Sequence, residues 1–223
     1  MGLAACGDGT VAVESVTLDQ NTLSLEVGKT ETLTATVTPD NATDKTVTWT
    51  TDNAEVATVA NGTVTAVAVG ETVITAKTGD KSATCSIVVA DKVLSTAAEL
   101  TAFATAVNGG NKYEGKTVAL GADIDLTDTA DWTPIGNGTR SGSSYTGKAF
   151  KGVLNGNGFT VSGFTFDGTY GADDAFGLVG VLDGGTVTDI IFEEIDLNIT
   201  DSECAGTAVG MVVNGGTVSD ISV

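Results

Sequence analysis

The sequence predicts an all-β protein in two parts: a β-sandwich, followed by a right-handed parallel β-helix that begins with one capping α-helix. Three observations support this prediction. Short runs over residues 11–91 alternate apolar and polar residues with the period of a β-strand. A single amphipathic segment follows near residue 100. After it, similar strand units recur between glycine-rich corners up to residue 223.

Composition and charge exclude several classes of function. The chain has 223 residues, with 10 Lys and Arg against 29 Asp and Glu, so its formal net charge is -19. It contains no histidine, which excludes Ser-His-Asp and Cys-His mechanisms and histidine metal sites. Three cysteines are too few for a four-thiolate zinc site. The acidic charge argues against nucleic acid, because phosphate contacts need clustered Lys and Arg, and it favours a monomer.

Residues 1–10 are predicted to form a flexible tail. Within it, Leu3-Ala4-Ala5-Cys6 resembles the lipobox of bacterial lipoproteins, in which cleavage precedes the cysteine and the thiol carries diacylglycerol. The basic and apolar parts of a signal peptide are missing before this motif, so we expect a misassigned start or a shortened chain. The resemblance implies lipidation at Cys6 and an outer-membrane anchor of two acyl chains. The alternative is a tail with an unrelated cysteine.

Residues 11–91 are predicted to form the β-sandwich. Alternation places one apolar set inward and a threonine-rich set in water. Turn signals separate the runs, and the strand spacing is typical of a sandwich of about seven strands. Trp49 is therefore predicted to be a core residue and not an exposed sugar platform, and Cys85 a small buried hydrophobe. The residues expected to point inward are Leu33, Ala35, Val37, Val47, Trp49, Ala83, Cys85, Ile87 and Val89.

Four stretches of this segment carry a family resemblance. They are LEVG at 25–28, VTPDNA at 37–42, VTW at 47–49 and GETVITA at 70–76. Together they resemble the bacterial Ig-like domain, group 2. The resemblance implies display on a bacterial surface, as a spacer or adhesive module, and no chemistry.

Residues 96–107 are the predicted helix. Thr96 and Glu99 have the spacing of a capping box. Glycines follow Asn108 and are expected to end the helix. One helical face is apolar, formed by Leu100, Phe103, Ala104 and Val107.

Residues 92–223 are predicted to be the helix-capped parallel β-helix. The units FTVSGF at 159–164, GTVTDI at 185–190 and GTVSDI at 216–221 align with one another. We expect stacking to place Val161, Val187 and Val218 above one another in the core. Because the sequence stops within a unit, we expect either that further repeats follow residue 223 or that another subunit covers the end.

Four stretches of this part resemble GLUG-repeat proteins. They are STAAELTAFATAVNGGNKYEGKTVALGADIDL from residue 95, WTPIGNG from 132, FKGVLNGNGFTVSGFTF from 150 and FGLVGVLDGGTVTDI from 176. Such repeats occur in secreted and surface proteins of bacteria that are described as adhesins. The resemblance implies adhesion and supplies no catalytic motif.

An acidic run is the candidate metal site. Asp123, Asp125, Asp128 and Asp131 offer hard oxygen ligands for Ca2+, although their spacing is not that of an EF-hand loop. The alternative is a structural strand with Ile124 and Leu126 inward. No other cofactor is expected.

Enzymatic activity is not predicted. A glycosidase needs two carboxyls facing one cleft, but Asp173-Asp174 and Glu193-Glu194 are adjacent pairs whose members point to opposite faces of a strand. Residues 152–223 hold no Lys or Arg to serve a polysaccharide lyase. Trp132 and Tyr145 are the candidate sugar-stacking residues, with packing beneath a loop as the alternative for Trp132.

These observations predict a non-enzymatic, extracellular protein of the bacterial cell surface. We expect an adhesin that binds host or glycan ligands along the β-helix, with the sandwich as a spacer and many weak contacts strengthened by multivalent display. The membrane is expected to be reached only through the lipid anchor. Two alternatives remain: a carbohydrate-active β-helix enzyme of the polysaccharide lyase or glycosidase type, and a purely structural spacer.

Overall fold

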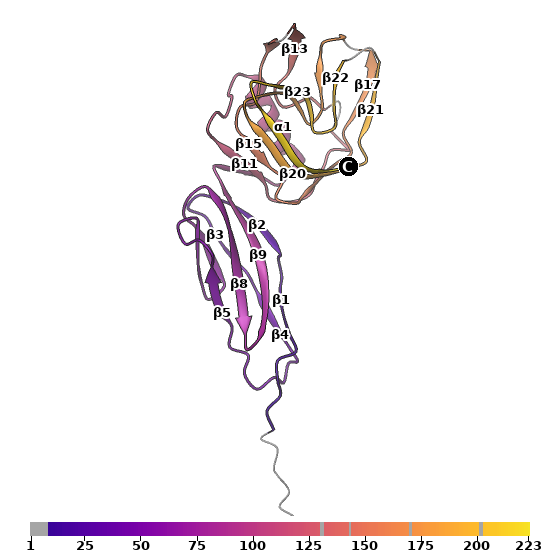
Figure 1. Cartoon of the computed structure of the whole chain (residues 1–223). Helices are drawn as coiled ribbons and strands as arrows, with labels where there is room; N and C mark the ends of the chain where they lie inside the picture. The colour runs from indigo at the N-terminus through magenta and orange to yellow at the C-terminus, as the bar shows by residue number, and fades with distance from the viewer. Residues whose placement is uncertain (1–8, 130–131, 143, 170, 201–202) are drawn as a thin grey trace, which may run out of the picture. The chain divides into compact units, whose positions relative to one another are not determined.

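The computed structural model describes residues 9–129, 132–142, 144–169, 171–200 and 203–223 (Figure 1). The chain divides into two compact units between Val89 and Ala90. Both units consist mainly of β-strands, and α1 (Ala97–Asn108) is the one helix among the described residues. The expectation of a mostly β protein with one helix is therefore confirmed over this part of the chain.

The first unit contains nine described strands in three sheets. One sheet has the order β2-β9-β8-β5, a second has the order β3-β7-β6, and β1 pairs with β4. The paired strands β8 and β9, β5 and β8, β3 and β7, and β6 and β7 all run antiparallel. The strands are β1 (Ser15–Leu18), β2 (Thr22–Glu26), β3 (Thr30–Thr32), β4 (Ala35–Thr38), β5 (Thr48–Thr51), β6 (Ala57–Ala60), β7 (Thr63–Ala66), β8 (Gly70–Thr78) and β9 (Lys81–Ala90).

The predicted inward residues of this unit lie in its core. Cys85 and Val89 have no exposed surface, and Ile87 has almost none. Trp49 is half-buried and packs against the same apolar cluster, so its predicted place in the core is confirmed. Alternation of side chains across a strand accounts for this result, because only one face of each sheet meets the core.

The predicted inward residues Leu33, Ala35 and Val37 lie where the chain passes from one sheet to another. β3, just before Leu33, pairs with β7, and β4, which contains Ala35 and Val37, pairs with β1. The chain changes sheets at Leu33 and Thr34: the amide of Leu33 donates to the Gly62 carbonyl, and that of Thr34 to the Asp19 carboxylate. Leu33 remains buried, so the apolar pattern survives the change of partner.

The helix α1 begins and ends where the sequence predicts. The Thr96 hydroxyl accepts from the amide of Glu99, and the Glu99 carboxylate accepts from the amide of Ser95. Gly109 caps the last turn, and Gly110 has a φ of 108°. The predicted apolar face is buried in the core of the second unit, where the Phe103 ring meets that of Phe150 edge-on at 5.7 Å.

The second unit is built from parallel strands. Among the described residues, every strand pair in it is parallel except the hairpin of β13 and β14. One sheet of seven strands contains β10-β11-β15-β20-β16-β12, with β24 beside β20. Three smaller sheets pair β17 with β21, β18 with β22 and β19 with β23. The strands are β10 (Lys92–Leu94), β11 (Thr117–Leu120), β12 (Ile124–Asp125), β13 (Gly138–Ser141), β14 (Ser144–Gly147), β15 (Val153–Asn155), β16 (Thr160–Ser162), β17 (Thr165–Thr169), β18 (Ala175–Phe176), β19 (Val179–Asp183), β20 (Thr186–Glu193), β21 (Asp196–Thr200), β22 (Cys204–Ala205), β23 (Val209–Val213) and β24 (Thr217–Ser222).

The stacking register differs from the prediction. Val187 lies opposite Val218, as expected, but its partner on the other side is Leu154. Val161 belongs to a different column, between Ile124 and Phe192. The predicted column of Val161, Val187 and Val218 is therefore wrong in its first member.

The bend of β20 explains this difference. Asp189 has a φ of 57°, in the left-handed region, and divides this long strand in two. The first part of β20 pairs with β15 and the second part with β16. Each repeat of the sequence can therefore contribute to two stacking columns. Aligning the repeats on their shared Thr-Val pair placed β16 in the wrong column.

The described sheets of the second unit do not close on one another. They form parallel stacks that share one core, from Leu94 beside the helix to Phe192. The structure therefore shows parallel stacking in a mostly β unit. These separate sheets do not show the predicted right-handed β-helix.

Candidate functional site

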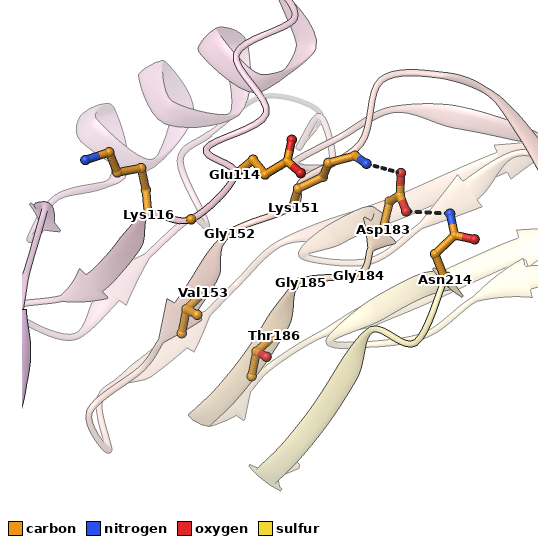
Figure 2. A pocket seen from close by; sticks show the side chains of 11 residues that line it. Glu114, Lys116, Lys151, Gly152, Val153, Asp183, Gly184, Gly185, Thr186 and Asn214 are labelled. Carbon is orange, nitrogen blue, oxygen red and sulfur yellow. Dashed lines mark hydrogen bonds and ion pairs between the residues drawn. The ribbon is translucent and has the colours of Figure 1, made fainter.

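A polar hollow of about 620 Å3 lies along one edge of the seven-stranded sheet (Figure 2). Its wall comes from four successive corners of the stack, each just before a strand of the sheet. Figure 2 shows these strands side by side, with the corner residues along their ends. The lining residues are Glu114, Gly115, Lys116, Lys151, Gly152, Val153, Asp183, Gly184, Gly185, Thr186 and Asn214. We call this hollow the corner groove.

Asp183 is the central polar residue of the corner groove. Its side chain is 7% exposed. One carboxylate oxygen, Oδ2, accepts from the Lys151 ammonium at 2.9 Å and from the Tyr145 hydroxyl at 2.9 Å. The other oxygen, Oδ1, accepts from the Asn214 amide at 2.6 Å. Charge-assisted bonds of this kind fix the carboxylate in place.

These contacts also set the protonation states. Burial of Asp183 by itself raises the pKa of its carboxyl, but the hydrogen bonds from Asn214, Lys151 and Tyr145 outweigh burial and leave that pKa below its ordinary value. The hydrogen bond to Asp183 raises the pKa of the Lys151 amine. Burial, followed by the bond to Asp183, raises the pKa of the Tyr145 phenol. At neutral pH the groove therefore holds a carboxylate and an ammonium in contact.

Glycine is required at the corners by close packing. A side chain at Gly152 would begin 2.6 Å from the Tyr113 carbonyl, and one at Gly185 would begin 2.4 Å from the Gly152 carbonyl. Both distances are shorter than real contacts of a Cβ atom, so successive corners touch through their backbones. This contact brings polar side chains from different corners into one row.

Two of the four candidate calcium ligands, Asp123 and Asp125, accept hydrogen bonds from neighbouring segments of the fold. Asp125 accepts from the amide and the hydroxyl of Thr127 at 2.8 and 2.6 Å, and these bonds lower the pKa of its carboxyl. Asp123 accepts from the amide of Thr160 at 2.8 Å. Asp128 is exposed, and Asp131 lies outside the described residues. Within the described part of the chain, no group of three His, Cys, Asp or Glu side chains is placed to hold a metal ion.

Two inward residues account for the acidic run. Ile124 is 1% exposed and Leu126 has no exposed surface, as the structural alternative predicts. Asp123 and Asp125, which flank Ile124, are exposed and accept from the backbone amides of Thr160 and Thr127.

The predicted aromatic platform is wrong. Trp132 is 4% exposed, and its indole nitrogen donates to the Gly177 carbonyl at 3.2 Å. Its ring packs against Phe164 at 6.3 Å between ring centres, inside the core. Tyr145 lies in the hairpin strand β14 and bonds to Asp183. A buried indole has no face for a sugar, so packing beneath the loop is the observed role of Trp132.

The remaining candidates are dispersed or lie outside the description. Cys6 falls among the residues that the structure does not describe. Arg140 bonds to Asp173 at 2.8 Å and to Glu203, while Thr139 bonds to Asp174 at 2.7 Å. The pair Asp173-Asp174 therefore ties the β13 hairpin to neighbouring loops. Cys85 and Cys204 are both buried, and neither forms a disulfide within the described part of the chain.

Sequence reasoning missed the cluster of Lys151, Asp183 and Asn214. Asp183 and Asn214 each precede a Gly-Gly-Thr-Val stretch, at 184–187 and 215–218. Equivalent positions before two aligned strands lie next to each other in a parallel stack. The shared Gly-Gly-Thr-Val stretch could therefore have predicted the contact of Asp183 with Asn214. The contacts of Lys151 and Tyr145 with Asp183 have no such signal, because they depend on how the segments that carry these two residues fold.

No described helix is long and apolar enough to cross a membrane.

The antiparallel sheets of the first unit enclose a common core and define it as an Ig-like sandwich. Residues 12–88 match the bacterial Ig-like domain (group 2), so this segment is a bacterial Ig-like domain. The resemblance seen in the sequence is thereby confirmed for the first unit. The family match ends at residue 88 and does not include the second unit.

Three relatives share parts of the chain. An Ig-like virion protein of Serratia phage KSP90 is 46% identical over 83 residues, which cover 35% of this chain and 32% of that protein. Halomucin of Haloquadratum walsbyi is 35% identical over 120 residues, 52% of this chain and 1% of that protein. An alpha-L-arabinofuranosidase of Bifidobacterium longum is 30% identical over 201 residues, 89% of this chain and 17% of that enzyme. The chain thus spans a third or less of each relative.

Proposed function

We propose that this chain is a non-enzymatic bacterial cell-surface protein that adheres to host or environmental glycans through its second unit. The Ig-like domain serves as a spacer in this proposal. The carrying observation is the corner groove, in which a buried carboxylate, an ammonium and an amide are fixed side by side on a stacked sheet. Such fixed donors and acceptors bind polar ligands without a large cost of ordering side chains.

The Ig-like domain supports the location at the cell surface. It forms a compact unit with a buried apolar core, and the corner groove belongs wholly to the other unit. The phage relative is an Ig-like protein of a virion by its name, which supports a role of this domain type in extracellular assemblies. The net charge of -19 supports solubility outside a lipid environment. Lipidation at Cys6 and an outer-membrane anchor complete the proposal.

For the second unit we propose a right-handed parallel β-helix of the GLUG-repeat type. Four strands, β11, β15, β20 and β24, pair in parallel and in register, with Val118, Leu154 and Val187 in one buried column. Parallel strands joined through glycine corners are the local geometry of such a fold. A monomer is sufficient for this arrangement.

Three of the described carboxyl groups are poorly suited to act as the general acid of a glycosidase. A glycosidase acid needs a raised pKa. In contrast, hydrogen bonds lower the pKa of the carboxyls at Asp91, Asp125 and Asp183. Carboxylates held by structural bonds are poor proton donors at neutral pH.

Binding is tested by immobilising the purified chain and applying a glycan array, with and without Ca2+. We expect binding to a subset of glycans that persists without Ca2+. The isolated Ig-like segment serves as the control, since it forms its own compact unit. If no glycan binds, the adhesin proposal is wrong and the purely structural spacer remains.

The relationship to the arabinofuranosidase favours a second candidate, an enzyme or enzyme module that acts on arabinose-containing polysaccharides. Incubation of the chain with arabinan, xylan and pectin, followed by a reducing-sugar assay, tests it. Release of sugar that disappears in the variant Asp183→Asn would replace the adhesin proposal. We expect no release above the heat-inactivated control.

A lipid anchor is tested separately. Expression of the complete gene in a bacterium supplied with radiolabelled palmitate is expected to label the protein, and Cys6→Ser to remove the label. Labelling that persists in Cys6→Ser would contradict the anchor without affecting the binding proposal.

A further inference from the structure

We propose that the corner groove binds a linear, neutral oligosaccharide that lies across the strands, with successive sugar units on successive corners. This inference rests on the proposed glycan-binding function and adds the site and the class of ligand. Three features of the groove support this ligand: its direction across the strands, its charge and its fixed polar groups.

The direction of the groove follows from the strand register. Thr117 lies opposite Val153, Val153 opposite Thr186, and Thr186 opposite Thr217. The residues just before these strands form the groove, so the groove runs from strand to strand and not along any one of them. Neighbouring strands are about 4.8 Å apart, so four corners extend over about 14 Å. A linear chain of a few sugar units fits this length.

The charge of the groove favours a neutral ligand. Both of its lysines already have carboxylate partners: Lys151 bonds to Asp183 at 2.9 Å, and Lys116 bonds to Asp91 at 2.8 Å. Glu114 adds a further negative charge to the wall. An anionic sugar would therefore meet paired lysines and a surplus of carboxylates, which disfavours its binding.

The fixed polar groups match hydroxyls. An ammonium donates three hydrogen bonds, and Lys151, whose side chain is 24% exposed, gives one of them to the buried Asp183 carboxylate. Its other donors are oriented by that bond and can be accepted by the oxygens of sugar hydroxyls. Tyr145 and Asn214 hold Asp183 from two sides, so the carboxylate is oriented before the ligand arrives.

Two glycines keep the groove open. Gly115 and Gly184 both have a φ of 69°, where other residues are strained. A side chain at Gly115 would meet nothing within 4 Å, and one at Gly184 would meet only the Asn214 carbonyl at 3.5 Å. The space beside these corners is therefore unoccupied by protein, and the ligand would reach the backbone there.

The test is isothermal titration of the whole chain with linear xylo-oligosaccharides and arabino-oligosaccharides of one to five units. Oligogalacturonides of the same lengths are the anionic counterparts. We expect at least one neutral series to bind, with affinity that rises up to three or four units. We expect the oligogalacturonides to bind at least ten-fold more weakly. Preference for the oligogalacturonides, or no gain with length, would overturn the proposal.

Variants locate the site. Asn214→Ala and Thr186→Trp are expected to weaken binding of the best neutral oligosaccharide at least ten-fold, the first by removing a polar group and the second by filling the groove. Thr165→Trp, at an exposed position on β17, is the control and is expected to bind as the parent does. Melting temperatures of all variants report whether they fold.

The outcomes separate this inference from the function beneath it. If folded Asn214→Ala and Thr186→Trp both bind like the parent chain, the groove is wrong but glycan adhesion stands. If the parent chain binds no glycan on the array or in titration, the proposed function fails and this inference with it.

Discussion

Val187 and Val218 face each other in register across β20 and β24, yet Val187 has no exposed surface and Val218 is 40% exposed. The two residues occupy the same column of the stack. Their difference shows that the core ends abruptly at β24, because only Val187 has a paired strand on each side among the described residues. The same abrupt change separates the buried Leu182 from its partner Val212, which is 46% exposed.

This pair predicts a gradient of stability along the column. Val187→Ala is expected to lower the free energy of unfolding of the second unit by about 2 kcal/mol, since it removes buried methyl groups and leaves a cavity. Val218→Ala is expected to lower it by less than about 1 kcal/mol. Urea unfolding followed by the fluorescence of buried Trp132, in a Trp49→Phe background, reports this unit alone. Equal losses for both variants would contradict the gradient.

The contacts of Asp183 predict a second effect on stability. Asp183→Ala leaves the Lys151 ammonium and the Tyr145 hydroxyl without their acceptor, and we expect a loss of about 2 kcal/mol. The loss lies below the full value for a buried ion pair because the Lys151 side chain is 24% exposed and partly solvated. The double variant Asp183→Ala with Lys151→Met is expected to recover part of this loss. Additive losses in the double variant would show that the two groups do not interact.

The same carboxyl predicts a pH dependence. The folded pKa of Asp183 lies below its unfolded value, so the carboxylate stabilises the fold fully above pH about 4. That stabilisation is lost as the pH falls through the folded pKa. The folded pKa of Lys151 is raised, so its contribution is lost only as the pH rises above about 10. Melting temperatures between pH 2 and 7 are expected to fall less steeply for Asp183→Asn than for the parent chain.

The helix cap predicts a local effect. Thr96→Ala removes the acceptor for the Glu99 amide and is expected to lower the free energy of unfolding by about 1 kcal/mol. Thr101→Ala, at an exposed position inside α1, is the matched control. We expect that change to stay within about 0.5 kcal/mol of the parent. An equal loss in Thr101→Ala would contradict a specific role of Thr96 in capping the helix.

The buried thiol of Cys85 in the Ig-like domain is expected to react slowly with alkylating reagents. Cys85 has no exposed surface, and burial, followed by the nearby Asp19 charge, raises the pKa of its thiol to about 11. The reactive thiolate is therefore scarce at neutral pH. Iodoacetamide labelling followed by peptide mass analysis is expected to modify Cys85 only after the first unit unfolds. Rapid labelling of the folded chain would contradict its burial.

The elements that could be predicted from the amino-acid sequence are those whose signals are local. Alternation predicted the inward faces of β4 and β9, because a strand presents every second residue to the core. The Thr96–Glu99 spacing fixed the start of α1, and glycines after Asn108 fixed its end, because helix caps depend on residues a few positions apart. The four Ig-like stretches likewise fixed the identity of residues 12–88.

Contacts between segments far apart in the chain could not be predicted from such local patterns. The change of sheets at Leu33, the bend at Asp189 and the burial of Trp132 all depend on partners far along the chain. The row of Lys151, Asp183 and Asn214 arises because parallel stacking brings equivalent corners together. The physical reason is that a strand's pattern states which face is apolar but not which neighbour covers it, and register between distant strands is set by the whole core.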